Sequence, residues 1–201
     1  MAWHRERGDE VNLVIVTRGI TELWTDDATE GTRREAVAAS ALLGVNQLRF
    51  LDFPAPVLDQ VPKYKLADAI RKVLLEFRPE IIYLPHRGDI HHDHRAVYWA
   101  TCVAARPTVE YAPQRLLSYE TPSETEWAAP GDDAFAPTIF VDISAHIDAK
   151  MRAMSYYSSQ MQAAPHPRSL ENAKALARYR GGAICAEYAE AFVLVREVVR
   201  L

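Results

Sequence analysis

The sequence predicts an α/β protein, a single domain with a Rossmann-like, mostly parallel sheet and helices on both of its faces. Short apolar runs alternate with helical patterns along the chain, which is typical of a parallel sheet covered by helices. The 201 residues are 49% apolar, which is enough for one well-buried core. Nothing in the sequence therefore requires a second domain.

The first part of the chain is expected to hold two strands with a helix between them. Residues 1–8 have the character of the tail of an earlier helix. Gly44 is expected to end the connecting helix, because glycine tolerates the left-handed conformation found there. The expected elements are a strand at 11–17, a polar loop at 21–31, a helix at 33–43 capped by Thr32, and a strand at 48–53.

The rest of the chain continues the alternation of helices and strands. An amphipathic helix is expected at 65–77, because its apolar residues recur at helical spacing. The Pro- and acid-rich interval 121–137 is expected to be a surface loop, and Gly181-Gly182 is expected to break a helix. The other expected elements are strands at 80–84, 115–119, 138–142 and 192–195, and helices at 95–105, 145–157 and 170–179.

The composition excludes several classes of protein. A net charge of -4 and a pI of 6.0, without a basic stripe, argue against a nucleic-acid partner. No apolar run reaches the roughly 18 residues of a membrane span, and no signal peptide is recognised, so a cytoplasmic location is expected. Cys102 and Cys185 lie in mostly apolar settings and are expected to be buried free thiols of a reducing compartment.

The densest cluster of reactive side chains is the histidine loop, residues 89–94, which follows the apolar run 81–85. It contains three histidines and two aspartates, ligand types that zinc accepts, at the end of a strand, where α/β folds bind ligands. One interpretation is a polar loop whose histidines are solvated or cap the next helix. Another is a metallo-β-lactamase-type hydrolase, but Asp89 replaces its first ligand and Pro167 follows the downstream His166.

Residues 85–97 of this sequence closely resemble the second motif of the PIG-L (LmbE-like) zinc-dependent de-N-acetylases. The motif here reads Pro-His-Arg-Gly-Asp-Ile-His-His-Asp-His-Arg-Ala-Val. Its core, Asp-x-His-x-Asp-His at the end of a strand, is moderately specific. Further segments that are similar to the family lie at 8–17, 34–44, 140–144, 175–181 and 187–192.

The resemblance implies a role for several residues. His94 matches a zinc ligand, so Zn²⁺ is the implied cofactor. His91 matches the histidine that polarises or protonates the substrate amide, and Asp93 the carboxylate that orients the His91 ring. One of the neighbouring arginines Arg33 and Arg34 is expected to contact substrate, with Arg34 as the candidate. Arg18 closes a strand at the expected active edge of the sheet and is expected to contact substrate as well. The implied reaction removes an N-acetyl group from an N-acetylated sugar or sugar conjugate, a small-molecule partner. His92 has no implied role, and Asp89 is expected to order the loop by accepting backbone N–H bonds.

The family's first motif, Ala-His-Pro-Asp-Asp-Glu, does not occur in this sequence. In the family it supplies two zinc ligands and the general base at the end of the first, central strand. We therefore expect an N-terminally truncated family domain that lacks this strand and has impaired activity, since a catalytic zinc needs three protein donors. A catalytically degenerate family member with a binding or structural role is the alternative. The acetylated substrate and the oligomeric state are left open.

Overall fold

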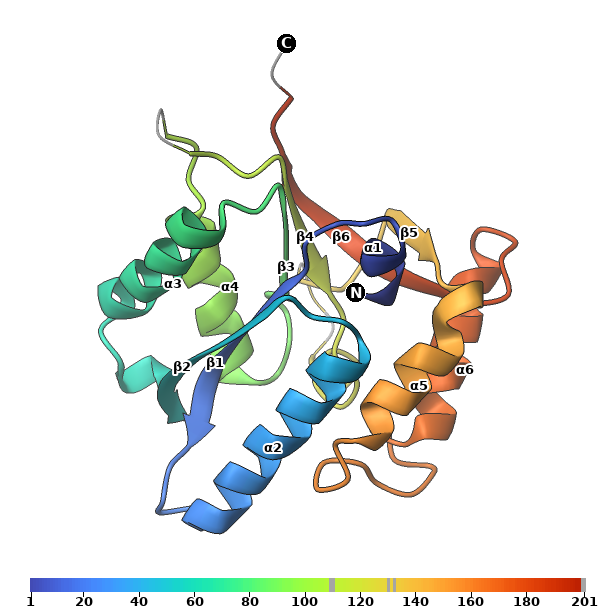
Figure 1. The fold of residues 1–201 in the computed structure, drawn as a ribbon, viewed down its shortest axis with the longest axis horizontal. Coiled ribbons are helices and arrows are strands. Elements are labelled where there is room, and N and C mark those ends of the chain that lie inside the picture. The colour runs from blue at the N-terminus through green and yellow to red at the C-terminus, as the bar shows by residue number, and fades with distance from the viewer. Residues whose placement is uncertain (109–110, 130, 132, 200–201) are drawn as a thin grey trace. The chain divides into compact units, whose positions relative to one another are not determined.

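A computed structural model describes residues 1–108, 111–129, 131 and 133–199 (Figure 1). Strands and helices alternate over the first half of the chain, and the mixed α/β class predicted from the sequence is confirmed. The chain forms two compact units. The first unit comprises Met1–Ala55 and Phe140–Glu190, and the second comprises Pro56–Ile139 and Ala191–Leu201. No helix in the described ranges is long and apolar enough to cross a membrane.

The first unit begins with a short helix followed by two parallel strands. The helix α1 spans Ala2–Glu6, as its sequence indicated. β1 (Asn12–Gly19) pairs in parallel with β2 (Gln47–Ala55), and Leu13 lies opposite Leu48 in this register. Both predicted strands are confirmed, and each is longer than predicted.

The helix α2 (Asp26–Leu42) joins β1 to β2 and begins earlier than predicted. The Thr25 hydroxyl accepts a hydrogen bond from the Ala28 backbone N–H at 3.2 Å, so Thr25 is the cap and the expected cap at Thr32 was wrong. Asp26 and Asp27 occupy the first turn, where negative charge is favoured by the helix dipole. Most of the expected loop at 21–31 is therefore helix. Gly44 follows the helix with a φ of 70°, as predicted.

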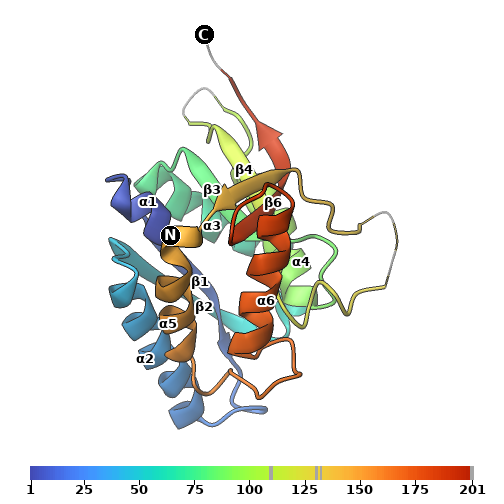
Figure 2. The same cartoon turned by 90° about the vertical axis from the view of Figure 1, so that its right-hand side faces the viewer.

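Two further helices belong to the first unit, α5 (Ile147–Ser155) and α6 (Leu170–Gly182). Figure 2 shows α5 running between α2 and α6. The helix α6 continues through the two glycines that were expected to break it. A Cβ on Gly181 would lie 2.6 Å from the Ala186 carbonyl oxygen, so glycine is needed there for close packing. The buried cluster of this unit comprises Ile143, Ile147 and Ala177, with Val141, Met151 and Tyr188 packed against it.

The second unit contains most of a four-stranded sheet of order β3-β4-β6-β5. β3 (Ile81–Pro85) and β4 (Arg115–Tyr119) are parallel, and β6 (Ala189–Glu197) is antiparallel to β4. β5 spans Ile139–Asp142. A short 3-10 turn (Leu58–Gln60) precedes α3 (Lys63–Phe77), which packs against α4 (His92–Ala104). The residues of α3 that are buried are Leu66, Ala67, Ile70, Val73 and Leu74.

The strands β1 and β3 both lie at the edge of their sheets. Within the described ranges no strand pairs with the outer side of either one.

Both cysteines are free, as expected, but they differ in burial. Cys102 is half-buried on α4, and burial raises the pKa of its thiol. Cys185 is exposed, so the expectation that it is buried was wrong. It lies in the turn after α6 with a φ of 57°, and this turn directs its side chain toward solvent.

Candidate functional site

The histidine loop joins the end of β3 to the start of α4. The helix begins at His92, where the sequence had suggested 95, so half of the loop is the first helical turn. His91 is the cap of α4, because its Nδ1 accepts the backbone N–H of Asp93 at 3.2 Å. The interpretation of a capping histidine is therefore correct for this residue. The rings of His91 and His94 stack with centroids 4.9 Å apart and planes 16° from parallel.

Asp89 is the most deeply buried polar residue of the loop, with 0% of it exposed. Its Oδ2 lies 2.8 Å from Nδ1 of His94, and its Oδ1 accepts a 2.7 Å hydrogen bond from the Thr125 hydroxyl. The expectation that this carboxylate accepts backbone N–H bonds was wrong. The side chain instead connects the His94 ring to the segment after β4.

Asp93 is also buried, but its carboxylate contacts a different part of the second unit. Its Oδ1 accepts the backbone N–H of Leu58 at 3.0 Å, and its Oδ2 has no hydrogen-bond partner among the described residues. The contact between Asp93 and the His91 ring is made by the Asp93 backbone, because the first turn of α4 directs the carboxylate toward Leu58. The orienting role predicted for Asp93 remains a prediction.

The segment after β4 packs closely over the start of the loop. His86 Nε2 lies 2.7 Å from the carbonyl oxygen of Asp133, and Arg87 Nε lies 2.8 Å from the Asp133 carboxylate. A Cβ on Gly88 would lie 2.1 Å from the same carbonyl oxygen, so only glycine fits. Sequence reasoning missed this contact and the role of Thr125. The glycine within the 85–97 motif was the one available signal.

Arg18 and Arg34 belong to the first unit, whereas His91, Asp93 and His94 belong to the second. Arg18 pairs with Asp26 at 3.1 Å, and Arg34 with Asp27 at 3.7 Å. Their expected contacts with substrate remain predictions.

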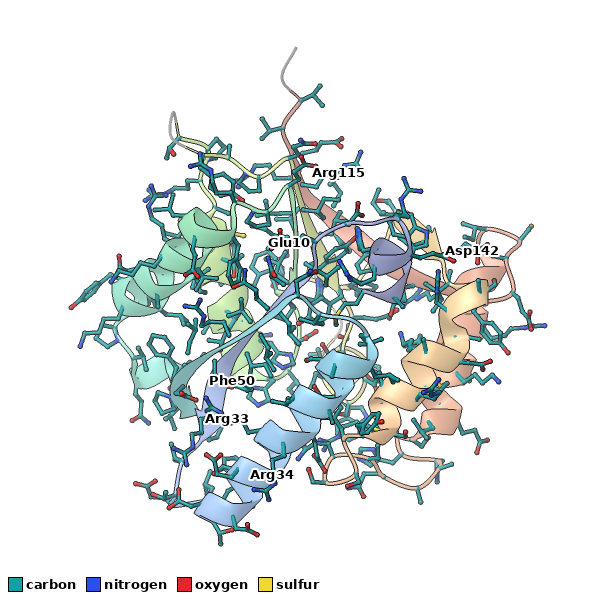
Figure 3. All side chains as sticks on the ribbon, in the orientation of Figure 1. Glu10, Arg33, Arg34, Phe50, Arg115 and Asp142 are labelled. Carbon is teal, nitrogen blue, oxygen red and sulfur yellow. The ribbon has the colours of Figure 1, made fainter. Side chains whose placement is uncertain are left out.

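The neighbouring Arg33 is held more firmly than Arg34. Its guanidinium lies 3.9 Å from the ring centroid of Phe50 and 2.6 Å from the Asp52 carboxylate. Figure 3 shows Arg33 on α2 close to Phe50 of β2 and Arg34 on the same helix. Because the aromatic ring and the carboxylate both hold it, Arg33 is the more firmly held of the two arginines, and the side chain of Arg34 is the more exposed.

The described residues do not by themselves fit a catalytic zinc ion. No group of three or more His, Cys, Asp or Glu side chains that would hold a metal occurs within the described ranges. The nearly parallel rings of His91 and His94 direct their nitrogens along separate planes, so the two histidines do not converge on one ion. Of the loop's two carboxylates, that of Asp89 contacts the His94 ring and the Thr125 hydroxyl, and Oδ1 of Asp93 accepts the Leu58 backbone N–H. His94 is the one predicted ligand present, and three protein donors are needed.

Several solved structures share this fold. The conserved protein TT1542 from Thermus thermophilus is 27% identical with a TM-score of 0.77, and the match covers 100% of this chain and 88% of that one. N,N'-diacetylchitobiose deacetylase from Pyrococcus horikoshii is 18% identical with a TM-score of 0.75, over 96% and 76% of the two chains. GalB, the 4-carboxy-2-hydroxymuconate hydratase from Pseudomonas putida KT2440, is 20% identical with a TM-score of 0.75, over 100% and 90%.

The sequence matches a family over more than half of its length. The matching family is PIG-L, described as GlcNAc-PI de-N-acetylase, and the match covers residues 1–105. That range includes the histidine loop and most of α4. The match therefore favours the PIG-L resemblance over the metallo-β-lactamase-type interpretation. The chain belongs to the PIG-L family, and its enzyme class is that of an N-deacetylase.

Proposed function

We propose that this protein hydrolyses the N-acetyl group of an N-acetylated amino sugar or sugar conjugate. The observation that carries the proposal is the family match across the histidine loop, together with the paired imidazoles at the end of β3. The fold alone does not select the reaction, because both a deacetylase and a hydratase share it. The deacetylase in that comparison acts on an N-acetylated sugar, which supports the proposed class of substrate.

In this proposal His91 acts on the substrate amide. Its Nδ1 accepts the Asp93 backbone N–H, so the proton of a neutral His91 ring is on Nε2. An Nε2–H can polarise the carbonyl oxygen of an amide or protonate its nitrogen as the bond breaks. Asp93 is proposed to orient the His91 ring, because the Asp93 backbone N–H donates a hydrogen bond to Nδ1 of that ring.

Zinc is the proposed cofactor, with His94 as a ligand. Because the described residues supply only this one of the predicted ligands, we propose that zinc binding and turnover by this chain are impaired. Arg34 and Arg18 are the proposed substrate-binding residues, since guanidinium groups in exposed ion pairs exchange partners at little cost. The proposed setting is cytoplasmic, with a small-molecule substrate.

The proposal is tested by two measurements on the purified chain. Acetate release is followed with a panel of N-acetylglucosamine derivatives, with and without added zinc, and bound zinc is measured by elemental analysis after desalting. We expect slow acetate release from at least one derivative and less than one zinc ion per chain. His94→Ala should abolish the acetate release.

Three other outcomes of these measurements would each overturn one part of the proposal. One tightly held zinc ion per chain with fast turnover would overturn the proposed impairment. No acetate from any derivative would overturn the deacetylase activity of this chain and favour the degenerate binding role. Acetate release that survives His94→Ala would remove the role of His94.

A further inference from the structure

The buried carboxylate of Asp89 is placed to control the proton position on His94. An ionised carboxylate only accepts hydrogen bonds, so the 2.8 Å contact between Asp89 Oδ2 and His94 Nδ1 requires the ring proton to be on Nδ1. The lone pair of His94 is then on Nε2. The side chain of His94 as a whole is 28% exposed.

The other oxygen of Asp89 is fixed by Thr125. The Thr125 hydroxyl oxygen accepts the Thr121 backbone N–H at 2.8 Å, which leaves its proton free to donate to Asp89 Oδ1 at 2.7 Å. The backbone of Asp89 is held as well, because Arg95 Nε donates to its carbonyl oxygen at 2.8 Å. With 0% of Asp89 exposed, water does not compete for these bonds.

The ring of His91 is held in the opposite tautomer by a different hydrogen bond. The Asp93 backbone N–H donates to Nδ1 of His91, so the proton of the neutral His91 ring is on Nε2. The two rings stack at 4.9 Å. The stacked pair therefore presents a proton donor at Nε2 of His91 and a lone pair at Nε2 of His94.

We infer that Asp89 is a positioning residue that sets the tautomer of His94, so that it is opposite to the tautomer of the stacked His91. It acts through His94, and Thr125 fixes the carboxylate that does so. The inference rests on the proposed function, since a donor and an acceptor side by side serve the hydrolysis of an amide. This role differs from that of Asp93, whose carboxylate contacts Leu58.

The test reads the tautomers directly by NMR of the metal-free chain with ¹⁵N-labelled histidine rings. Spectra are recorded at about pH 9, because an ordinary imidazole is neutral there and shows its tautomer. Signals are assigned with His91→Gln and His94→Gln. In the unmodified chain we expect the proton on Nδ1 of His94 and on Nε2 of His91.

Asp89→Asn should move the His94 proton to Nε2 and leave His91 unchanged. The amide oxygen stays with the Thr125 hydroxyl, so the amide NH₂ faces His94 Nδ1 and donates to it. Thr125→Val removes a bond to Asp89 but keeps the carboxylate, so His94 should keep its proton on Nδ1. Asp9→Asn is the matched control, because Asp9 contacts the Nδ1 of His4 at 2.7 Å and should affect only that ring.

A His94 ring with its proton on Nε2 in the unmodified chain would overturn the inference, whether or not the variants fold. So would an Asp89→Asn chain that melts like the unmodified protein and keeps the Nδ1 proton. If acetate is released, Asp89→Asn should lower kcat about 10- to 100-fold at an unchanged KM. Expected tautomers without acetate release would overturn only the proposed function, and wrong tautomers with acetate release would overturn only this inference.

Discussion

The histidine loop and the arginine-bearing face of α2 both contain charged residues that the sequence assigned to a site, but they are held differently. In the loop Asp89 is fully buried, and its carboxylate binds side chains from two segments. On α2 the side chains of Arg34 and Asp27 are 70% and 95% exposed, and their 3.7 Å contact is screened by water. The difference indicates a preorganised group in the loop and an adaptable one on the helix.

Among the substitutions that test this contrast, Gly88→Ala is expected to change the free energy of unfolding most. Gly88→Ala places a Cβ 2.1 Å from the Asp133 carbonyl oxygen, so the loop or its covering segment must move. We expect a loss of about 3 kcal/mol in the free energy of unfolding, at the upper end for overpacking. Gly31→Ala on α2 is the matched control, where the nearest atom is 3.8 Å away and a gain of about 0.5–1 kcal/mol is expected.

Chemical denaturation of the two glycine variants measures these free energies. Equal stability of Gly88→Ala and the unmodified chain would mean that the loop is as adaptable as the surface of α2. It would contradict the claim that the loop is preorganised.

Two substitutions of Asp93 separate its structural role from a role in catalysis. Asp93→Ala leaves the buried Leu58 N–H without an acceptor, which should cost about 2 kcal/mol of unfolding free energy. Asp93→Asn keeps an oxygen in the same place and should cost less than about 1 kcal/mol. If Asp93→Asn is stable and also retains full acetate release, the charge of Asp93 has no part in catalysis.

The two adjacent arginines of α2 provide a smaller test. Arg33→Ala removes the contact with Phe50 and the ion pair with Asp52, and we expect it to destabilise the chain by about 1 kcal/mol. Arg34→Ala should change stability by less than about 0.5 kcal/mol and raise KM at an unchanged kcat. A KM effect from Arg33 rather than Arg34 would reverse the assignment of the substrate-binding arginine.

The smallest effect is expected at Glu35, where α2 is tethered to the segment after α5. Burial acts to raise the pKa of Glu35, but hydrogen bonds from Ser159 and Ser158 outweigh it and lower the pKa below its ordinary value. The carboxylate therefore stabilises the fold above its unfolded-state pKa, and this contribution is lost as the pH falls through the folded-state value. Glu35→Gln should be less stable than the unmodified chain at pH 7, by under about 1 kcal/mol, and the gap should close in acid.

Thermal melting of both proteins across this pH range measures the gap. A difference that stays constant from neutral to acid pH would show that the charge of Glu35 does not contribute.

Most strands and helices could be predicted from the sequence because their apolar periodicity is local. The starts of two helices could not. The start of α2 carries residues that cap helices well, Thr25, Asp26 and Asp27. The threonines and Gly31 that follow have low helix propensity, so the sequence predicted a loop there. Similarly, a histidine is an unusual cap, so the start of α4 was placed after the histidines.

The histidines of the candidate site were predicted, but the partners of the loop's two carboxylates were not. Asp93 precedes His94 in sequence, yet the first turn of α4 directs its carboxylate to Leu58. Asp89 lies five residues before His94 and contacts its ring together with Thr125. Thr125 and Leu58 are each more than 30 positions from their aspartate, so no local pattern could reveal these contacts.

The most direct measurement of the role of the histidine loop compares acetate release by His91→Ala, His92→Ala and His94→Ala. His92 is the internal control, because it is exposed on the first turn of α4 and has no proposed role. Loss of at least about 100-fold is expected for His91→Ala and His94→Ala, with His92→Ala close to the unmodified chain. Equal rates for all three variants and the unmodified chain would place the reaction elsewhere in the molecule.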